Sequence, residues 1–204
     1  MPDYNVRSLS AMMAVFTVRL TCALAIAIYS SGVRAIAQTP QPHLERSFTQ
    51  WCRQLPNLSA EARHTVETLL IQAGTEDCEQ ATQELSRRNQ INLSFNQISN
   101  IEPLAALSKL TRLILLKLSH NQIQDISPIA EIANLQELVL ENNQIMDISP
   151  LAKLNQLTWL FLRNNQITDM SSLLELSNLI WLDLQENAIA QPRCPINRSD
   201  ACLF

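Results

Sequence analysis

Aliphatic residues recur in a fixed pattern along the second half of the chain. The segment 135–154, LQELVLENNQIMDISPLAKL, has aliphatic residues first at alternate positions and then at wider spacings. Close copies begin at Leu113, Leu157 and Leu179, and a degenerate copy surrounds Ile91. An asparagine occupies the same place in each copy, at Asn96, Asn121, Asn143, Asn165 and Asn187. The first two of these asparagines are 25 residues apart, and each later pair is 22 residues apart. The first copy therefore carries an insertion of three residues.

Each copy predicts one short strand followed by a turn. In the segment 138–140 the alternation Leu-Val-Leu predicts a strand whose leucines face inward. Repeats that stack align such strands into a parallel sheet and bury its inner face. The recurring asparagine falls where the chain leaves the strand. Five occurrences in one register predict a ladder of buried amides that satisfy backbone groups of the turns.

The second half of each copy predicts a short helical turn on the opposite, convex side. Ser-Pro at 127–128 and at 149–150 begins this turn, because serine is a favoured N-cap and proline is tolerated at the first helical position. The aliphatic residues expected to pack beneath it are Ile129, Ile132, Leu151 and Leu154.

A column of aspartates, Asp125, Asp147 and Asp169, lies two residues before the serine positions. A ladder of calcium ions along this column is one interpretation. No second column of ligands accompanies it, so we favour local bonding of the carboxylates to the turn backbone. We expect no metal site.

The repeated unit LxxLxLxxN, continued as N-x-I-x-D-I-S-P-L-A-x-L, resembles the internalin-type leucine-rich repeat of bacteria, over roughly residues 88–191. The same repeat type occurs in regulatory subunits of eukaryotic phosphatases. The resemblance implies an α/β leucine-rich-repeat solenoid, with short parallel strands on the concave face and short helical turns on the convex face. Four segments are expected: a signal peptide (1–37), a helical N-terminal cap (38–88), about five repeats (89–191) and a C-terminal cap (192–204).

The cap segments are expected to cover the apolar ends of the solenoid. Residues 47–88 predict two helices. Ser59 is the expected N-cap of the first helix, whose apolar stripe ends at Gly74, and Thr75 is the expected N-cap of the second. Trp51 is expected to lie in the core of the N-terminal cap.

Four cysteines remain when the leader is removed: Cys52, Cys78, Cys194 and Cys202. One pair precedes the repeats and one follows them, so Cys52–Cys78 and Cys194–Cys202 are the expected disulfides, because crossed pairs would have to span the solenoid. A zinc site is the competing interpretation, but the sequence has no CxxC motif and no neighbouring pair of histidines.

The first 37 residues resemble a secretory leader in their pattern. Arg7 and Arg19 precede an apolar run over 20–28, and Ala35-Ile36-Ala37 fits a cleavage signal, which predicts cleavage after Ala37 and a secreted or periplasmic protein. An uncleaved membrane anchor and a lipoprotein site at Cys22 are the alternatives. The apolar run is short for a membrane span, and Cys22 opens the run where a lipoprotein cysteine would close it.

Composition excludes several functional classes. The formal net charge of −4 gives no electrostatic footprint for nucleic acid. Only two glycines are present, and no glycine-rich phosphate-binding motif occurs. The histidines His43, His64 and His120 have no evident acid or nucleophile partner, so we expect neither catalysis nor a cofactor.

The residues between the leucines of each strand are expected to face outward on the concave side. The candidate ligand-binding positions are Lys117, Glu137, Val139, Glu141, Trp159, Phe161, Arg163, Trp181 and Asp183. Adjacent strands lie about 4.8 Å apart, so the two tryptophans and the phenylalanine are expected to form one patch beside the arginine.

This patch favours a protein partner, bound by a monomeric module on its concave face, because Trp and Arg are frequent hot-spot residues. A cell-wall or surface glycan is the alternative ligand, since tryptophans also suit sugar rings. Cross-strand stacking that only stabilises the sheet is a third interpretation of the same residues.

Overall fold

A computed structural model describes residues 46–190, 192–196 and 201–204. The chain divides into two units, and every described residue belongs to the second, His43–Phe204. The expected signal peptide, its cleavage site after Ala37, Cys22 and His43 lie outside the described residues. No helix within the described part of the chain is long and apolar enough to cross a membrane.

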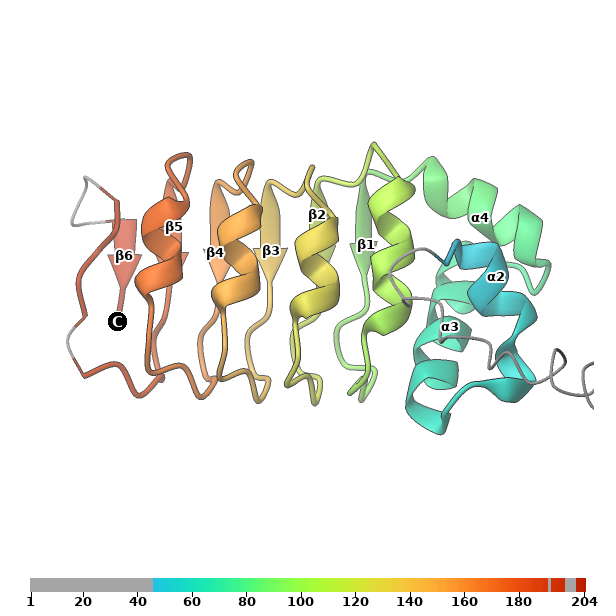
Figure 1. Cartoon of the computed structure of the whole chain (residues 1–204), viewed down its shortest axis with the longest axis horizontal. Helices are drawn as coiled ribbons and strands as arrows, with labels where there is room; N and C mark the ends of the chain where they lie inside the picture. Colours follow the sequence, from blue (N-terminus) through green and yellow to red (C-terminus); the bar gives the residue numbers. More distant parts are fainter. Residues whose placement is uncertain (1–45, 191, 197–200) are drawn as a thin grey trace, which may run out of the picture. The chain divides into compact units, whose positions relative to one another are not determined.

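The second unit contains a parallel sheet of six short strands in sequence order (Figure 1). The strands are β1 (Gln90–Asn92), β2 (Leu115–Lys117), β3 (Glu137–Val139), β4 (Trp159–Phe161), β5 (Trp181–Asp183) and β6 (Cys202–Leu203). Neighbouring strands pair without any register shift, so equivalent residues of successive repeats lie side by side.

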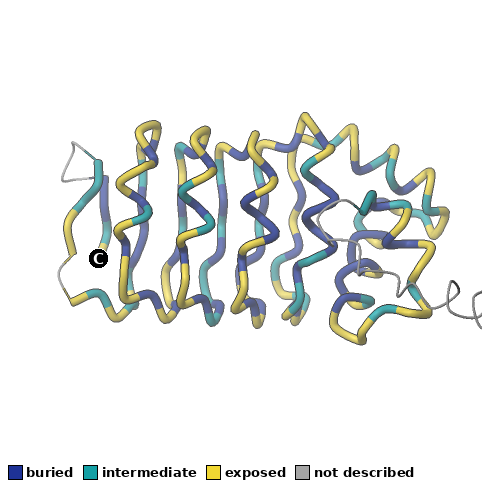
Figure 2. Tube along the Cα trace, in the orientation of Figure 1, coloured by how far each residue is buried: buried dark blue, intermediate teal, exposed yellow. Residues whose placement is uncertain are grey.

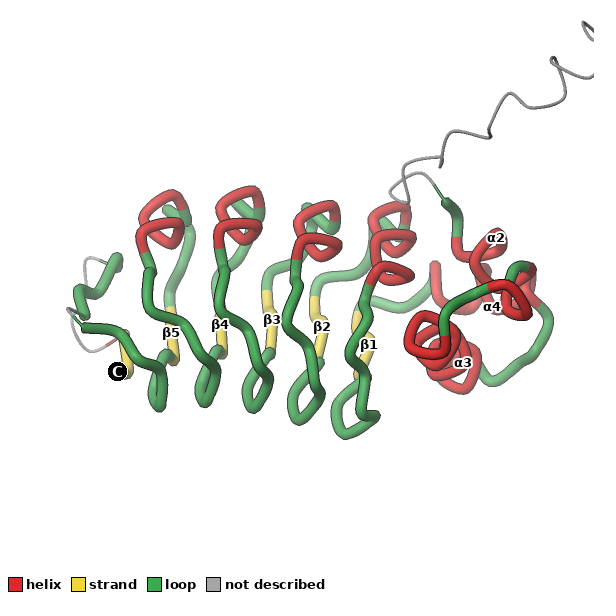
Figure 3. Tube along the Cα trace, turned by 60° about the horizontal axis from the view of Figure 1, so that its bottom comes forward, coloured by secondary structure: helices red, strands yellow, loops and turns green. Residues whose placement is uncertain are grey.

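Each of the first four repeats returns through a short 3₁₀ helix on the side opposite to the strands (Figures 1 and 3). These helices are η4 (Glu102–Lys109), η5 (Ser127–Glu131), η6 (Ser149–Lys153) and η7 (Ser171–Glu175). Strands on one side and helical turns on the other confirm the predicted α/β leucine-rich-repeat solenoid.

The core lies between the strands and the 3₁₀ helices, as the buried inner positions in Figure 2 show. The central leucines of the strands, Leu116, Leu138, Leu160 and Leu182, pair in register and have no exposed surface. Burial of each such side chain contributes about 1.5–3 kcal/mol of hydrophobic free energy. The aliphatic residues expected beneath the helical turns, such as Ile129 and Leu151, are also fully buried.

The serines of the Ser-Pro pairs are not N-caps, contrary to the sequence prediction. Ile126 and Ile148 occupy the N-cap positions of η5 and η6, and neither makes a side-chain capping bond. The aspartate two residues before each serine bonds its backbone instead: Asp125 Oδ1 accepts from Ser127 N at 2.8 Å, and Asp147 Oδ1 accepts from Ser149 N at 2.8 Å. These bonds confirm the interpretation of the aspartate column as local turn bonding.

The three-residue insertion of the first repeat lengthens its 3₁₀ helix. η4 has eight residues, whereas η5, η6 and η7 have five each. Two helices of the N-terminal cap, α2 (Phe48–Arg53) and α3 (Ala60–Ala73), contact η4. The insertion therefore enlarges the convex surface on which the cap packs.

The N-terminal cap consists of α2, η3 (Leu55–Asn57), α3 and α4 (Cys78–Ser86). Ser59 caps α3 by accepting from Ala62 N, and Gly74 ends that helix in the left-handed conformation with φ 75°, both as predicted. Thr75 does not cap the next helix. Asp77 is its N-cap and accepts from Gln80 N at 2.7 Å, while the Thr75 hydroxyl accepts from Asp77 N.

Both expected disulfides are present. Cys52–Cys78 links α2 to the start of α4, and Cys194–Cys202 closes a loop that ends in β6, each with Cα atoms 5.7 Å apart. Trp51, beside Cys52, is 1% exposed and lies in the core of the cap as predicted. Strand β6, at the end of this loop, pairs with β5. Just after β5, Leu184 N donates to Leu203 O at 2.8 Å. The loop thereby covers the edge of the last repeat strand.

Candidate binding surface

The outward residues of the strands form rows across the sheet, because the strands pair in register. One row contains Glu137, Trp159 and Trp181, and the next contains Val139, Phe161 and Asp183. The zero register shift thus brings together the aromatic residues that the sequence predicted as one patch. We call Trp159, Phe161 and Trp181 the concave aromatic patch.

The two tryptophans of the patch stack on each other. Their ring centroids lie 6.3 Å apart, and the ring planes are inclined by 29°. Trp159 nevertheless keeps 42% of its surface exposed, while Trp181 and Phe161 are partly buried. Stacking therefore orders the rings and still leaves a large apolar surface facing solvent.

Charged side chains flank the patch. Lys117 and Glu137 lie on neighbouring strands and Glu141 follows β3, and all three are half-buried. Arg163 is exposed and donates to the carboxylate of Glu186, and this hydrogen bond, together with the negative charge, raises the pKa of the guanidinium above its ordinary value. The patch is therefore an apolar centre with polar and charged neighbours, which is the arrangement found at protein interfaces.

Asp183 departs from the prediction that it faces solvent. It is only 7% exposed, and its Oδ1 accepts from Gln185 N at 3.0 Å. Phe161 pairs with it on one side and Leu203 of β6 on the other. The strand added by the C-terminal cap therefore encloses Asp183, and its carboxylate serves the turn that follows β5.

Two shallow hollows of about 230 Å³ each lie on the strands of the first repeats. One includes Ile114, Leu115, Glu137 and Trp159 in its lining, so it adjoins the aromatic patch. The other includes Arg88 and Lys117. The side-chain ammonium of Lys117 has no hydrogen bond or ion pair with the described part of the chain and is available to an acidic group.

The ladder asparagines bind backbone groups of two consecutive repeats. Asn143 Nδ2 donates to Leu118 O at 3.0 Å and to Leu140 O at 2.9 Å, while its Oδ1 accepts from Ile123 N at 3.1 Å. The equivalent bonds recur at Asn121, Asn165 and Asn187. Asn96 has no repeat before it, and its Nδ2 donates to Ser94 O within its own repeat. Four asparagines therefore form the predicted ladder, whereas Asn96 is only half-buried and, contrary to the prediction, does not join two repeats.

Sequence reasoning missed a second column, one residue before the ladder asparagines. It consists of Phe95, His120, Asn142, Asn164 and Glu186, and all five have positive φ between 52° and 63°. His120, Asn142 and Asn164 are residue types enriched in this conformation, and they were the available signal. We call these residues the turn strip.

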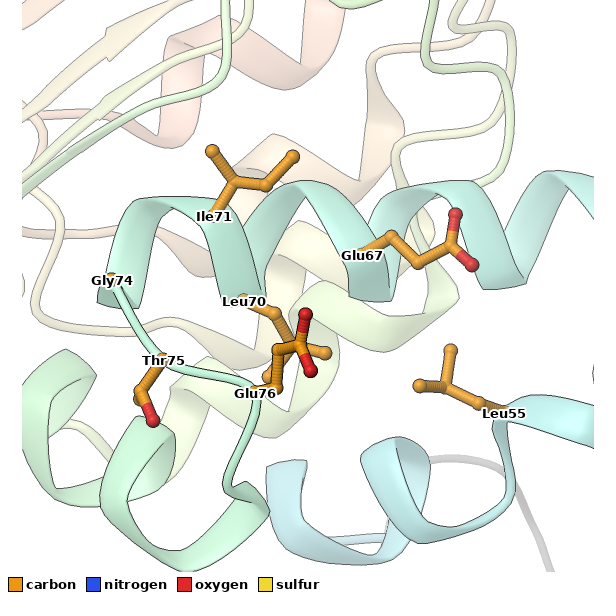
Figure 4. A pocket seen from close by; sticks show the side chains of 7 residues that line it. All are labelled: Leu55, Glu67, Leu70, Ile71, Gly74, Thr75 and Glu76. Carbon is orange, nitrogen blue, oxygen red and sulfur yellow. The ribbon is translucent and has the colours of Figure 1, made fainter.

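The N-terminal cap contains a further hollow, of about 790 Å³, between α3 and the segments around it (Figure 4). Its lining comprises Leu55, Glu67, Leu70, Ile71, Gly74, Thr75 and Glu76. The sequence predicted helix boundaries at Gly74 and Thr75 but no binding site here. Nowhere in the described ranges do three or more His, Cys, Asp or Glu residues gather as potential metal ligands.

Comparisons with known proteins agree with the repeat architecture. A family model described as leucine-rich repeats (two copies) matches residues 111–153. The solved structure of an internalin (inlF) from Listeria monocytogenes is 38% identical, with a TM-score of 0.50, over 55% of this chain and 32% of that chain. Internalin C2 from the same organism is 35% identical, with a TM-score of 0.50, over 61% and 53% of the two chains. No curated protein matches in sequence.

The chain thus spans about a third of the first internalin structure and about half of the second. Its repeats are leucine-rich repeats of the bacterial internalin type, which confirms the resemblance inferred from the sequence. A fold of this kind supports protein–protein interaction.

Proposed function

We propose that this chain is an exported recognition module that binds a protein partner with its concave face, centred on Trp159 and Trp181. The observation that carries the proposal is the exposure of Trp159, which keeps 42% of its surface in contact with solvent although it stacks on Trp181. An exposed apolar patch rimmed by polar residues is a common mark of an interaction surface.

The neighbours of the patch favour a protein over a glycan on this face. Lys117 and Arg163 carry positive charge on either side of Glu137 and Glu141, so both signs surround the apolar centre. Such mixed charges complement a protein surface and fix its register, whereas most sugar hydroxyls are neutral. The hollow beside Trp159 gives an anchoring side chain of the partner a place to insert.

We also propose that the chain is exported and cleaved after Ala37. The leader pattern supports this, and so do the two disulfides, because structural disulfides persist mainly in oxidising compartments. Mass spectrometry of the protein recovered from outside the cytoplasm is expected to give a mature chain that begins at Gln38. A chain that retains residues 1–37 would contradict this part of the proposal.

A catalytic role is not proposed, because the described histidines serve other contacts. A ring nitrogen of His64 lies 2.6 Å from Asn96 O, and His120 stacks on Phe95 with ring centroids 4.2 Å apart. Neither has a carboxylate partner within the described part of the chain. A histidine is the side chain that most often acts as general acid or base, and an adjacent carboxylate commonly orients such a histidine.

Site-specific photo-cross-linking tests which face binds the partner. A benzoylphenylalanine residue is placed at Val139, beside the aromatic patch, or at Leu174, an exposed position of η7 on the convex side. The protein is irradiated in extracts of its natural surroundings, and cross-linked partners are identified by mass spectrometry. We expect one protein to be captured from Val139 and not from Leu174. Capture of that protein from Leu174 alone would place the interface on the convex face.

A further inference from the structure

The hollow at the first two strands gathers positive charge. Arg88, which precedes β1, and Lys117 of β2 both line it, together with the amides of Gln72, Gln90 and Asn92. Among the described residues that line it there is no carboxylate, although the chain as a whole has a formal net charge of −4. We call it the basic hollow.

The fold holds two of the donors of the basic hollow in place. Arg88 Nη2 donates to Gln72 O of α3 at 2.5 Å, and this bond uses one of the five guanidinium N–H groups. Asn92 Oδ1 accepts from Ser94 N at 3.0 Å, so the Nδ2 group is the part of this amide that faces a ligand as a donor. Donors that are fixed before binding lose less conformational entropy when a ligand arrives.

The chain does not neutralise the two cations of the basic hollow. Neither Arg88 nor Lys117 forms an ion pair with a carboxylate anywhere in the described ranges. The residues that pair with Lys117 on the two adjacent strands are not acidic. Arg163, farther along the concave face, differs because it already donates to Glu186. The basic hollow therefore presents positive charge that an anion from outside the chain can neutralise.

The basic hollow adjoins the hollow beside Trp159. Gln90 and Leu115 line both, so the two hollows form one groove over the strands from β1 to β4. Trp159 of β4 lies at one end of this groove, and Lys117 of β2 lies two strands away at the other. Two strand spacings correspond to about 10 Å. The groove thus has an apolar end and a basic end at a defined separation.

We propose that the basic hollow binds a carboxylate of the protein partner, an Asp or Glu side chain that lies about 10 Å from the apolar side chain packed against Trp159. The inference rests on the proposed binding of a protein by the concave face and adds the chemistry of its partner. Guanidinium and ammonium groups form charge-assisted hydrogen bonds with carboxylates, and the amides of the hollow supply further donors. A basic partner surface is disfavoured at this end of the groove because like charges repel.

Selection of a random peptide library, displayed on phage, against the purified protein tests the proposal. We expect the selected peptides to be enriched in Asp or Glu together with an aromatic or aliphatic residue. Selection against Lys117→Glu is expected to change the preference from acidic to basic residues. A synthetic peptide selected on the unaltered protein is expected to bind Lys117→Gln about tenfold more weakly, measured by fluorescence anisotropy.

Lys153 provides the matched control, because it is also a lysine but lies on η6, on the convex side. Lys153→Glu and Lys153→Gln make the same changes of charge and are expected to select and bind peptides as the unaltered protein does. Circular dichroism checks that each variant is folded.

The inference is overturned by a selection that yields no binding peptide, by peptides without enrichment of acidic residues, or by a folded Lys117→Glu variant that selects the same acidic peptides as Lys153→Glu. Binding of heparin that is lost in Lys117→Gln, without acidic peptides, would assign the hollow to an anionic glycan and reject the protein carboxylate.

The test separates this inference from the concave-face proposal. Peptides that lose affinity in Trp159→Ala but not in Lys117→Gln would reject the basic hollow and leave the concave-face proposal standing. Acidic peptides that depend on Lys117 and not on Trp159 would support the hollow and count against the aromatic patch. Cross-linking from Val139 remains the independent test of which face binds the natural partner.

Discussion

Trp159 and Trp181 occupy paired positions on adjacent parallel strands and stack with ring centroids 6.3 Å apart. A repeat of 22 residues produces this relationship, because it places equivalent residues of successive repeats side by side. The stack explains how two large aromatic rings remain ordered on an open sheet face. The same two residues have two possible roles, support of the sheet and binding of a partner. Substitutions can distinguish these roles.

The stacking contribution is expected to be small relative to the stability of the solenoid. In a double-mutant cycle of Trp159→Ala and Trp181→Ala, we expect a coupling free energy of about 0.5–1.5 kcal/mol. Equilibrium unfolding in urea measures it. A coupling indistinguishable from zero would mean that the rings do not stack in solution.

The asparagine ladder is expected to contribute more to the free energy of unfolding than the tryptophan stack does. Asn143→Ala leaves buried backbone groups of Leu118, Leu140 and Ile123 without their partner, so we expect a loss of about 3 kcal/mol in the free energy of unfolding. Asn96→Ala is the matched control, because the side chain of Asn96 bonds only within its own repeat, and its loss is expected to be about 1 kcal/mol. Equal losses in urea unfolding would contradict the ladder.

Both disulfides are expected to stabilise the fold, and the longer loop more strongly. Cys52–Cys78 spans 26 residues of sequence and Cys194–Cys202 spans 8. Loop entropy gives about 3.5 kcal/mol for the first and about 2.5 kcal/mol for the second. Paired Cys→Ser variants, compared by thermal unfolding, are expected to follow this order. An unchanged Tm on reduction with dithiothreitol would count against both contributions.

Acid is expected to weaken the turn that precedes η7. Asp169 accepts from the backbone N–H and the hydroxyl of Ser171, and these hydrogen bonds lower the pKa of its carboxyl. A lowered folded-state pKa gives a contribution that is present above the unfolded value of about 3.9 and is lost as pH falls through the folded value. Unfolding midpoints measured from pH 6 to pH 2 are expected to fall less in Asp169→Asn than in the unaltered protein. Parallel pH profiles would contradict this role.

Features that depend on periodicity could be predicted from the sequence. The strand positions, the buried leucines and the paired Trp159 and Trp181 all follow from a repeat that stacks in register. The disulfide pairing followed from the placement of the cysteines at the two ends of the array.

Features that depend on competition between neighbouring groups were predicted wrongly or missed. Ser127 was expected as a cap, but Asp125 already binds its N–H, and the helix begins with Ile126 as N-cap. Asp183 was expected to be exposed, but the pairing of β6 depends on a loop outside the repeat. The turn strip was missed because a left-handed Phe95 contradicts its conformational preference.

The most direct test of the concave-face proposal is the affinity of the cross-linked partner for the double variant Trp159→Ala/Trp181→Ala, with Leu174→Ala as the exposed convex-side control. Biolayer interferometry gives the Kd, and circular dichroism checks that each variant is folded. Removal of two interfacial tryptophans is expected to weaken binding about a hundredfold or more, while the control binds as the unaltered protein does. A folded double variant that keeps its affinity within about threefold, well under one kcal/mol, would contradict the account.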